Sequence, residues 1–432
     1  MKSNQNISNT TSWNLPTLVT FRFFFVYLFL NIFPFPLYYI GSIIGQDDLF
    51  SFYTNWTQEL SVWIGKNILG IKYEIIMGPN GSGDTTADYI FQFITLCIAI
   101  ITSVIWSFLD FRRKNYSTLF MYLRVFVRYY IAATMFSYGF SKAFTLQFSE
   151  LSLMDLVKTY GNSSPMGLMW NFMEYSDTYT RFSGYAEIIA GILLVFRKTT
   201  LFGALMTVAV MFNVFMMNMS YDIPVKLYSG LLTIMGLFLL APDLKRIINF
   251  LLLNKPVQPK VFTPYFTKHK AKTATLIAKT LVICFFLYTN ISESAEGQKK
   301  WGKEAPKSSL YGIYEVIEFI KNNDTLPPLT TDTIRLKRIL VDKRYTGLQT
   351  MDEKFIYKKE KTDTISKTLE LTAYRDSTDV QKLQYRIQDS LYFFEGIYYG
   401  DTLKIKTKKK KRNEFLLINR GFHWINEYPF NR

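Results

Sequence analysis

The hydrophobic and polar positions of this chain follow two different patterns, which meet near residue 292. Residues 18–291 contain nearly all of the long apolar runs, whereas residues 292–432 are rich in Lys, Thr, Asp and Glu. A membrane helix needs about 20 mostly apolar residues. The candidate runs, two of them short, are 19–41, 89–109, 119–143, 181–197, 200–219, 226–241 and 273–290. This pattern predicts an all-α polytopic membrane bundle of about seven transmembrane helices.

After Asn290 the apolar residues alternate with polar ones, which is typical of half-buried strands. The clearest cases are 368–373 and 403–406, and further candidates are 312–319, 333–341, 354–359, 383–395 and 414–419. We therefore predict a small antiparallel β barrel or sandwich, most specifically a lipocalin-like barrel. The basic run 408–412 is interpreted as a solvated hairpin turn. Residues 420–427 are interpreted as the last strand closing the barrel, or alternatively as the lining of a binding site.

The charges in the loops predict an orientation. Three basic stretches, 112–114, 197–198 and 242–273, fall on one side of a seven-span arrangement. The opposite loops carry acidic residues, namely Asp47, Asp48, Glu59, Asp84, Asp88, Glu150, Asp155 and Glu174. Cytoplasmic loops carry the excess of Lys and Arg. We therefore expect a bacterial inner-membrane protein with a cytoplasmic N-terminus and an extracytoplasmic C-terminal domain. Residues 242–273 form either an amphipathic segment on the cytoplasmic leaflet or an ordinary basic connector.

Composition narrows the chemistry. The net charge of +16 suits a membrane surface, and the run 408–412 lacks the interleaved aromatic residues of a nucleic-acid surface, so no nucleic-acid partner is expected. Cys97 and Cys284 lie in separate apolar runs and are expected to be isolated thiols. The two histidines, His269 and His423, lie outside the spans. This excludes a haem held by two intramembrane histidines, a His-rich metal centre and a Ser–His hydrolase site within the bundle.

Ionisable side chains inside the apolar runs are the candidate functional residues, because such groups are costly in a membrane. Arg128, Tyr138 and Lys142 lie in the third run, and Glu187 lies in the fourth. Spacing along the helices allows a buried Arg128–Glu187 or Lys142–Glu187 pair. Such a pair either fixes helix register or forms part of a site for a quinone headgroup, a proton or a polar substrate.

The loops on the predicted outer side add two features. Asp222 and Lys226 follow the fifth run and are predicted to guard the outer mouth of the polar centre. The loop 79–86, PNGSGDTT, lacks the Lys of a phosphate-binding P-loop. We interpret it as turn chemistry in which Asp84 caps the second helix.

Two blocks of the sequence resemble the DoxX-like bacterial membrane proteins. They are 128–142, RYYIAATMFSYGFSK, and 184–243, beginning GYAEIIAGILLVFRK; NGSGDTT at 80–86 and YGNSSPMG at 160–167 are similar to a longer subgroup. The resemblance covers about 18–290. It implies a four-helix membrane unit, and some members resemble the small membrane subunit of a thiosulfate:quinone oxidoreductase while others are tied to maturation of redox enzymes. It supplies no catalytic residues.

These interpretations divide the chain into four segments. Residues 1–118 hold two helices and an outer loop, 119–243 form the four-helix unit, 244–291 hold the basic segment and the seventh helix, and 292–432 form the β-rich domain. The preferred hypothesis is an accessory protein of a cell-envelope process, linked to quinone and not a stand-alone enzyme. The alternatives are a transporter or lipid-handling protein, and a non-catalytic scaffold whose outer domain binds an envelope protein.

Overall fold

The computed structural model describes residues 12–431, except 261, 263–267 and 344. The chain divides into two compact units. The helical unit contains residues up to Phe144 together with Thr178–Ser294, and the barrel unit contains Thr145–Asp177 together with Ala295–Arg432. Residues 145–177, which the sequence pattern placed with the four-helix segment, thus belong to the barrel unit.

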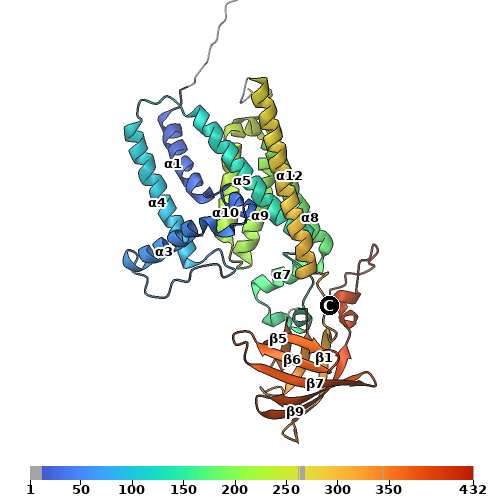
Figure 1. The fold of residues 1–432 in the computed structure, drawn as a ribbon. Helices are drawn as coiled ribbons and strands as arrows, with labels where there is room; N and C mark the ends of the chain where they lie inside the picture. The colour runs from blue at the N-terminus through green and yellow to red at the C-terminus, as the bar shows by residue number, and fades with distance from the viewer. Residues whose placement is uncertain (1–11, 261, 263–267, 344, 432) are drawn as a thin grey trace, which may run out of the picture. The chain divides into compact units, whose positions relative to one another are not determined.

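Long helices make up most of the helical unit (Figure 1). They are α1 (Leu15–Ile32), α4 (Thr86–Leu109), α5 (Ser117–Ala143), α8 (Asp177–Val195), α9 (Thr200–Ser220), α10 (Lys226–Leu240) and α12 (His269–Lys300). Shorter helices are α2 (Tyr38–Ile43), α3 (Ser51–Asn67), α11 (Leu244–Ile247) and the π-helix Ile248–Leu252. The helical N-terminal part of the sequence prediction is confirmed.

Six helices in the described part of the chain are long and apolar enough to cross a membrane, one fewer than the sequence pattern predicted. The six are α1, α4, α5, α9, α12 and the stretch Lys226–Leu252 that begins with α10. The predicted span at 181–197 does form a helix, α8, but this helix carries Asp177, Arg181 and Glu187. Its charged and polar residues explain why α8 is less apolar than the others.

The centre of the helical unit is a shared apolar core between α1, α5, α8, α9 and α10. Ile131, Met135, Leu194, Ala204 and Met235 are completely or almost completely buried there. Away from this core the helices expose apolar side chains, and only 6% of the apolar window of α12 is buried. An apolar outer surface around a packed core is what a helix bundle surrounded by lipid requires.

Two glycines allow α5 and α8 to approach closely. A Cβ atom added to Gly184 would lie 2.6 Å from the backbone oxygen of Gly139, and one added to Gly139 would lie 2.9 Å from the oxygen of Gly184. Small residues at such crossings are typical of membrane helix packing. This contact sets the height of α8 against α5.

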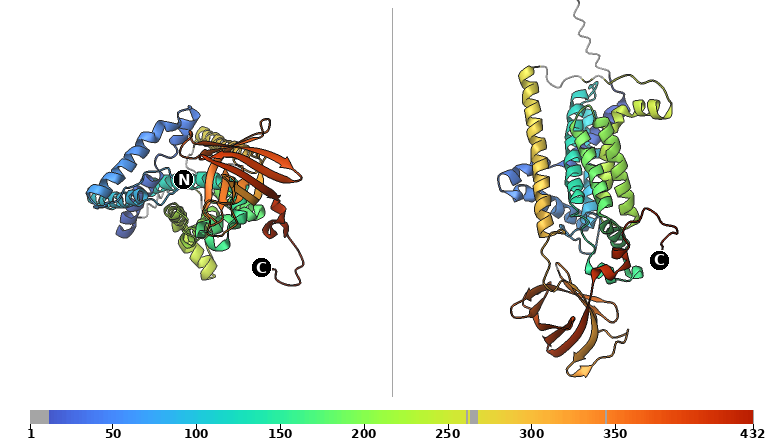
Figure 2. Two further views of the ribbon diagram at one scale, coloured as in Figure 1. Left: turned by 90° about the horizontal axis from the view of Figure 1, so that it is seen from below. Right: turned by 90° about the vertical axis from the view of Figure 1, so that its right-hand side faces the viewer.

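The barrel unit contains nine antiparallel strands. They are β1 (Gly312–Lys321), β2 (Asp324–Thr325), β3 (Leu336–Val341), β4 (Thr346–Thr350), β5 (Phe355–Asp363), β6 (Thr368–Ala373), β7 (Val380–Gln388), β8 (Leu391–Tyr398) and β9 (Asp401–Lys410). Each strand from β3 to β8 pairs with the next, and β1 pairs with both β3 and β9. The result is a closed eight-stranded up-and-down barrel, with β2 added beside β1 (Figure 2).

The barrel interior is filled by apolar side chains, including Tyr314, Phe319, Ile339, Leu369 and Phe394. The cavity among them is only about 10 Å³. Such a volume is at the lower limit for a single water molecule. The described interior is therefore a packed core rather than a ligand chamber of the kind that larger lipocalin-like barrels enclose.

Several strand predictions are confirmed and others are wrong. The segment 383–395 is two strands, because Asp389 and Ser390 have φ values of 49° and 64° and make a tight turn between β7 and β8. The strand β4 was not predicted, since all five of its residues are buried and it shows no alternation. Its outer side is covered in part by Met154, which a Cβ on Gly347 would meet at 2.8 Å.

The C-terminal predictions also need correction. Lys408–Lys410 are not a hairpin turn but the last residues of β9, paired with β1. Residues 414–419 are not a strand: they include the helix α13 (Leu416–Asn419), and residues 420–427 form no strand either. The pairing of β9 with β1 closes the barrel without them.

Within the loop 79–86, Asp84 caps a different helix from the one expected. Thr85 and Asp88 form a capping box at the start of α4. Asp84 instead accepts hydrogen bonds from the backbone N–H groups of Lys226 (2.7 Å) and Leu227 (2.9 Å) at the start of α10. The loop therefore fastens two helices that are far apart in sequence.

Candidate functional site

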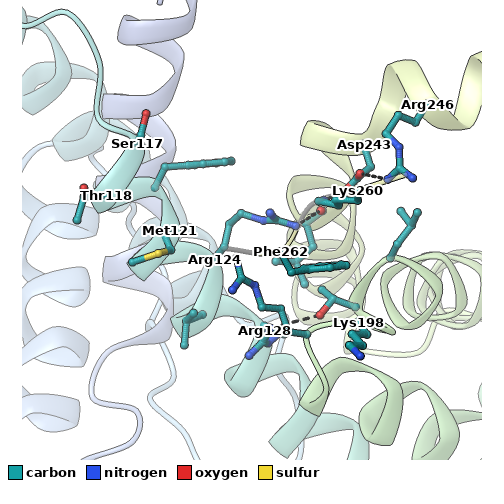
Figure 3. A pocket seen from close by; sticks show the side chains of 16 residues that line it. Ser117, Thr118, Met121, Arg124, Arg128, Lys198, Asp243, Arg246, Lys260 and Phe262 are labelled. Carbon is teal, nitrogen blue, oxygen red and sulfur yellow. Dashed lines mark hydrogen bonds and ion pairs between the residues drawn. The ribbon is translucent and has the colours of Figure 1, made fainter. Parts of the chain in front are cut away.

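A basic cavity of about 600 Å³ lies at one end of the helical unit, where the first turns of α5 face the α8–α9 connection and the end of α10. Its lining residues are Ser117, Thr118, Phe120, Met121, Arg124, Val125, Arg128, Arg197, Lys198, Thr200, Leu201, Leu239, Asp243, Arg246, Lys260 and Phe262. Six of these side chains are basic and one is acidic. Figure 3 shows Arg124 and Arg128 extending from α5 toward the space that Lys198, Lys260 and Phe262 border.

Arg128 is the most deeply placed of these cations and is 7% exposed. Its Nη1 donates to Thr200 Oγ1 at 3.3 Å, and its guanidinium lies 5.2 Å from the centre of the Tyr129 ring. Its Nε atom is buried and has no hydrogen-bond partner among the described residues. A buried N–H group without a partner is costly, and an anion in the cavity would satisfy it.

The carboxylate in the lining is already neutralised. Asp243 is buried, accepts a hydrogen bond from Arg246 at 2.7 Å and also pairs with Lys260. Asp243 is the one acidic side chain in the described lining, against six basic ones. Coulomb attraction for an anion is much stronger at such a partly desolvated place than in water.

Part of the cavity lining is apolar or aromatic. The guanidinium of Arg124 lies 5.8 Å from the centre of the Phe120 ring, and that of Arg197 lies 5.5 Å from the centre of the Phe262 ring. Met121, Val125, Leu201 and Leu239 also line the cavity. The cavity therefore combines a cationic group of side chains with a surface that suits hydrocarbon.

The second polar feature is a buried ion pair between α5 and α8. Lys142 donates to Glu187 Oε1, and the two residues are 7% and 1% exposed. The other carboxylate oxygen, Oε2, is buried without a hydrogen-bond partner among the described residues. The Lys142–Glu187 alternative is thus the pair that forms.

Arg128 does not join this pair. At ~1.5 Å per residue it lies roughly 21 Å along α5 from Lys142, and its partner is Thr200. Spacing along the helices allowed an Arg128–Glu187 pair because it does not give the register of α8 against α5. The structure separates the predicted polar centre into two sites at different heights.

Tyrosines lie beside the ion pair. The ammonium of Lys142 lies 5.7 Å from the centre of the Tyr138 ring, and the rings of Tyr138 and Tyr228 are 6.3 Å apart. The Tyr228 hydroxyl makes hydrogen bonds with the hydroxyls of Tyr130 (3.1 Å) and Thr134 (3.2 Å). Sequence reasoning found Tyr138 but did not single out Tyr228 or Tyr130.

Asp222 and Lys226 form a separate group at the start of α10. Lys226 lies 3.0 Å from Asp222 and 3.7 Å from Asp84, but the Asp222 side chain is 87% exposed. No contact of either residue with the Lys142–Glu187 pair is observed among the described residues. Their interactions hold the start of α10 and the loop before α4 together. No cluster of potential metal ligands occurs in the described parts of the chain.

The sequence analysis did not predict that the basic cavity residues form one site. Arg197, Lys198, Arg246 and Lys260 lie in the basic stretches that served only to predict orientation. They come together because the ends of α5, α8 and α10 meet at one end of the unit. The signal that could have found them was the recurrence of Arg and Lys beside apolar helix ends.

Comparison with known proteins yields one informative relative. Protein YwoB of Bacillus subtilis (strain 168), an uncharacterised protein, is 31% identical over 122 residues. The chain belongs to the family of YwoB. The matched stretch covers 77% of YwoB and 28% of this chain. No protein-family model matches the chain, and no solved structure matches it.

Proposed function

We propose that this chain is an inner-membrane protein that binds the phosphate group of an anionic lipid in the basic cavity at the cytoplasmic end of its helices. The observation that carries this proposal is the buried guanidinium of Arg128. Among the residues that the structure describes, its Nε has no partner, and the cavity lining holds other cations and a single neutralised carboxylate. Arg forks match phosphate oxygens in geometry and charge. Basic pockets between membrane helices on the cytoplasmic side are typical sites for anionic headgroups.

The cavity suits a lipid better than a free anion. Its volume of about 600 Å³ lies within the usual range for ligand pockets, roughly 300–1,000 Å³. Part of its lining is apolar, and Phe250, Leu251 and Leu252 are exposed shortly after Arg246, which lines the cavity. Apolar residues next to Lys and Arg are typical of segments that lie in the headgroup region of a leaflet.

The orientation rests on the basic loops. The stretches 112–114, 197–198 and 242–273 are cytoplasmic in this proposal, with α8 as a relatively polar fourth crossing that α5 and α9 shield. The chain then crosses seven times and the barrel is extracytoplasmic. This places the cavity on the leaflet side where anionic headgroups give a negative surface potential.

The experiment measures lipid binding to the purified full-length protein. Thermal unfolding in mild detergent is followed with added short-chain phosphatidylglycerol, with phosphatidylcholine of the same chain length, and with inorganic phosphate at constant ionic strength. Phosphatidylglycerol is expected to raise the midpoint of the wild type and of Arg112→Gln, a loop arginine that does not line the cavity. Arg128→Gln should weaken the affinity about tenfold or more, since a hydrogen bond to a charged group is worth roughly 1.5–3 kcal/mol.

Each arm has a distinct meaning. Equal stabilisation by inorganic phosphate would retain the anion site but reject a lipid as its occupant. Equal effects of phosphatidylglycerol and phosphatidylcholine would reject recognition of the charge. An unchanged affinity in folded Arg128→Gln would reject the cavity as the site.

A quinone-linked accessory role is a second candidate, favoured by the Lys142–Glu187 pair. Glu187 Oε2 is buried and has no donor within the described part of the chain, so it could accept a hydrogen bond from the hydroxyl of a reduced quinone. The resemblance to DoxX-like proteins supports the same candidate. Its test is the quinone content of protein purified in mild detergent, measured by mass spectrometry for the wild type and Glu187→Gln. Background quinone alone, equal in both, would reject it.

A further inference from the structure

The C-terminal segment presents aromatic side chains that the barrel does not use. After β9 the chain forms a short turn at Arg412–Glu414 and the helix α13, and residues 420–431 have no regular secondary structure. Trp424 is 90% exposed and Tyr428 is 84% exposed, and Phe422 and Ile425 are similarly exposed. Exposed single apolar residues are ordinary, but a contiguous group that includes Trp and Tyr marks an interaction surface.

Polar contacts on the inner side hold this segment in shape. The guanidinium of Arg420 donates to the ring of His423 and to Asn426 Oδ1 at 2.7 Å, and it lies 4.7 Å from the centre of the Phe430 ring. Asn426 Nδ2 donates to the backbone oxygen of His423 at 3.1 Å. Residues 420–430, called the aromatic hook from here on, therefore curl around Arg420. Because these contacts already order the segment, its exposed aromatic side chains would lose less conformational entropy on binding.

The hook leaves the barrel at the end where the chain enters it. Ile313, near the start of β1, pairs with Lys410, the last residue of β9. Arg412 donates to the Tyr311 hydroxyl at 3.3 Å and lies 3.3 Å from Glu150, so the start of the tail is fastened to this end. β1 begins only a short linker after α12, a candidate membrane span. The linker, residues 301–311, thus joins α12 to the same end of the barrel that the hook leaves.

We propose that the aromatic hook inserts into the headgroup–acyl boundary of the bilayer leaflet on the barrel side. Trp and Tyr are enriched at that boundary because their rings are apolar while their N–H and O–H groups stay hydrated. Between residues 421 and 430 the hook has one formal charge, Glu427, and the Arg420 cation turns inward. The hook would fix the tilt of the barrel on the membrane. This proposal is independent of the basic cavity.

The test measures the membrane depth of a spin label on the hook in the full-length chain. Ile425→Cys is labelled in a Cys97→Ser, Cys284→Ser background and reconstituted in nanodiscs of phosphatidylethanolamine and phosphatidylglycerol. Ser377→Cys, an exposed site in the loop at the opposite end of the barrel, is the matched control. Compared with the label at position 377, the label at position 425 should collide more often with oxygen, which is apolar. It should no longer collide with a water-soluble nickel complex.

The outcomes decide the proposal. Collision rates at 425 equal to those at 377 would overturn it, because the hook would then lie in water. Protection from both reagents would also overturn it, since the hook would be buried against protein. Adding Arg420→Gln, which removes the contacts that shape the hook but not its aromatic residues, should move the label toward water. An unchanged depth in this variant would overturn the assigned role of Arg420.

Discussion

The buried pair of Lys142 and Glu187 makes the sharpest stability prediction. Glu187→Met leaves the Lys142 ammonium buried beside an apolar side chain, and Lys142→Met leaves the carboxylate without its donor. Breaking a buried ion pair at one partner costs about 3–5 kcal/mol, because the remaining charge is uncompensated. Replacing both partners by Met removes both charges and keeps similar volumes, so the double variant should lie near the wild type.

The assay is the free energy of unfolding in mixed micelles with increasing dodecyl sulfate, followed by circular dichroism. The two single variants and the double variant form a thermodynamic cycle, and we expect a coupling of about 3 kcal/mol or more. Lys226→Met is the matched control. Its partner Asp222 is largely exposed, and Asp84, 3.7 Å away, keeps its two backbone donors, so the loss should stay below about 1 kcal/mol. Costs of Lys142→Met and Glu187→Met that simply add in the double variant would refute the reasoning.

Three further predictions concern packing, capping and pH. Gly184→Ala should destabilise the helical unit by about 1–3 kcal/mol, seen as a lower unfolding midpoint, because its Cβ would meet the Gly139 backbone oxygen at 2.6 Å. Asp84→Ala should cost about 1 kcal/mol and speed amide hydrogen exchange at Leu227, whose N–H loses its acceptor. Burial alone would raise the pKa of Glu150, but a hydrogen bond from Lys343 and nearby cations hold it below its ordinary value. The stability that Glu150 contributes is therefore present above about pH 4.3 and lost as pH falls through its folded-state pKa. In Glu150→Gln the thermal unfolding midpoint should decrease less steeply with falling pH than in the wild type.

Each of these has a matched control in the chain. Gly230→Ala should be tolerated better, because its Cβ would meet only the Phe215 side chain, at 3.3 Å. Asp222→Asn should leave the exchange at Leu227 unchanged, since Asp222 pairs with the exposed side of Lys226. Glu318→Gln changes an exposed residue, so its unfolding midpoint should decrease with falling pH as in the wild type. Equal effects of test and control variants would contradict the corresponding argument.

Continuous apolarity predicted most of the helices, because a helix surrounded by lipid must be apolar whatever its neighbours are. Alternation predicted β6 and β9 but missed β4, since a strand covered on both faces shows no alternation. The ion pair required the packing register. Lys142 and Glu187 each lie three residues after the glycine at the α5–α8 contact, and only that contact shows that their heights match. The cavity was out of reach because its cations lie in separate loops that the fold brings together.

The separation of the two polar sites makes the two candidate functions independently testable. Arg128 and Lys142 lie about 21 Å apart on α5, and substitutions that far apart usually have additive effects. If the cavity binds an anionic lipid, Arg128→Gln should reduce lipid binding and leave quinone content unchanged. If Glu187 holds a quinone, Glu187→Gln should do the reverse. Loss of both ligands in either variant would instead show that the substitution disturbs the common core around Ile131 and Met135, and neither assignment could then rest on that variant.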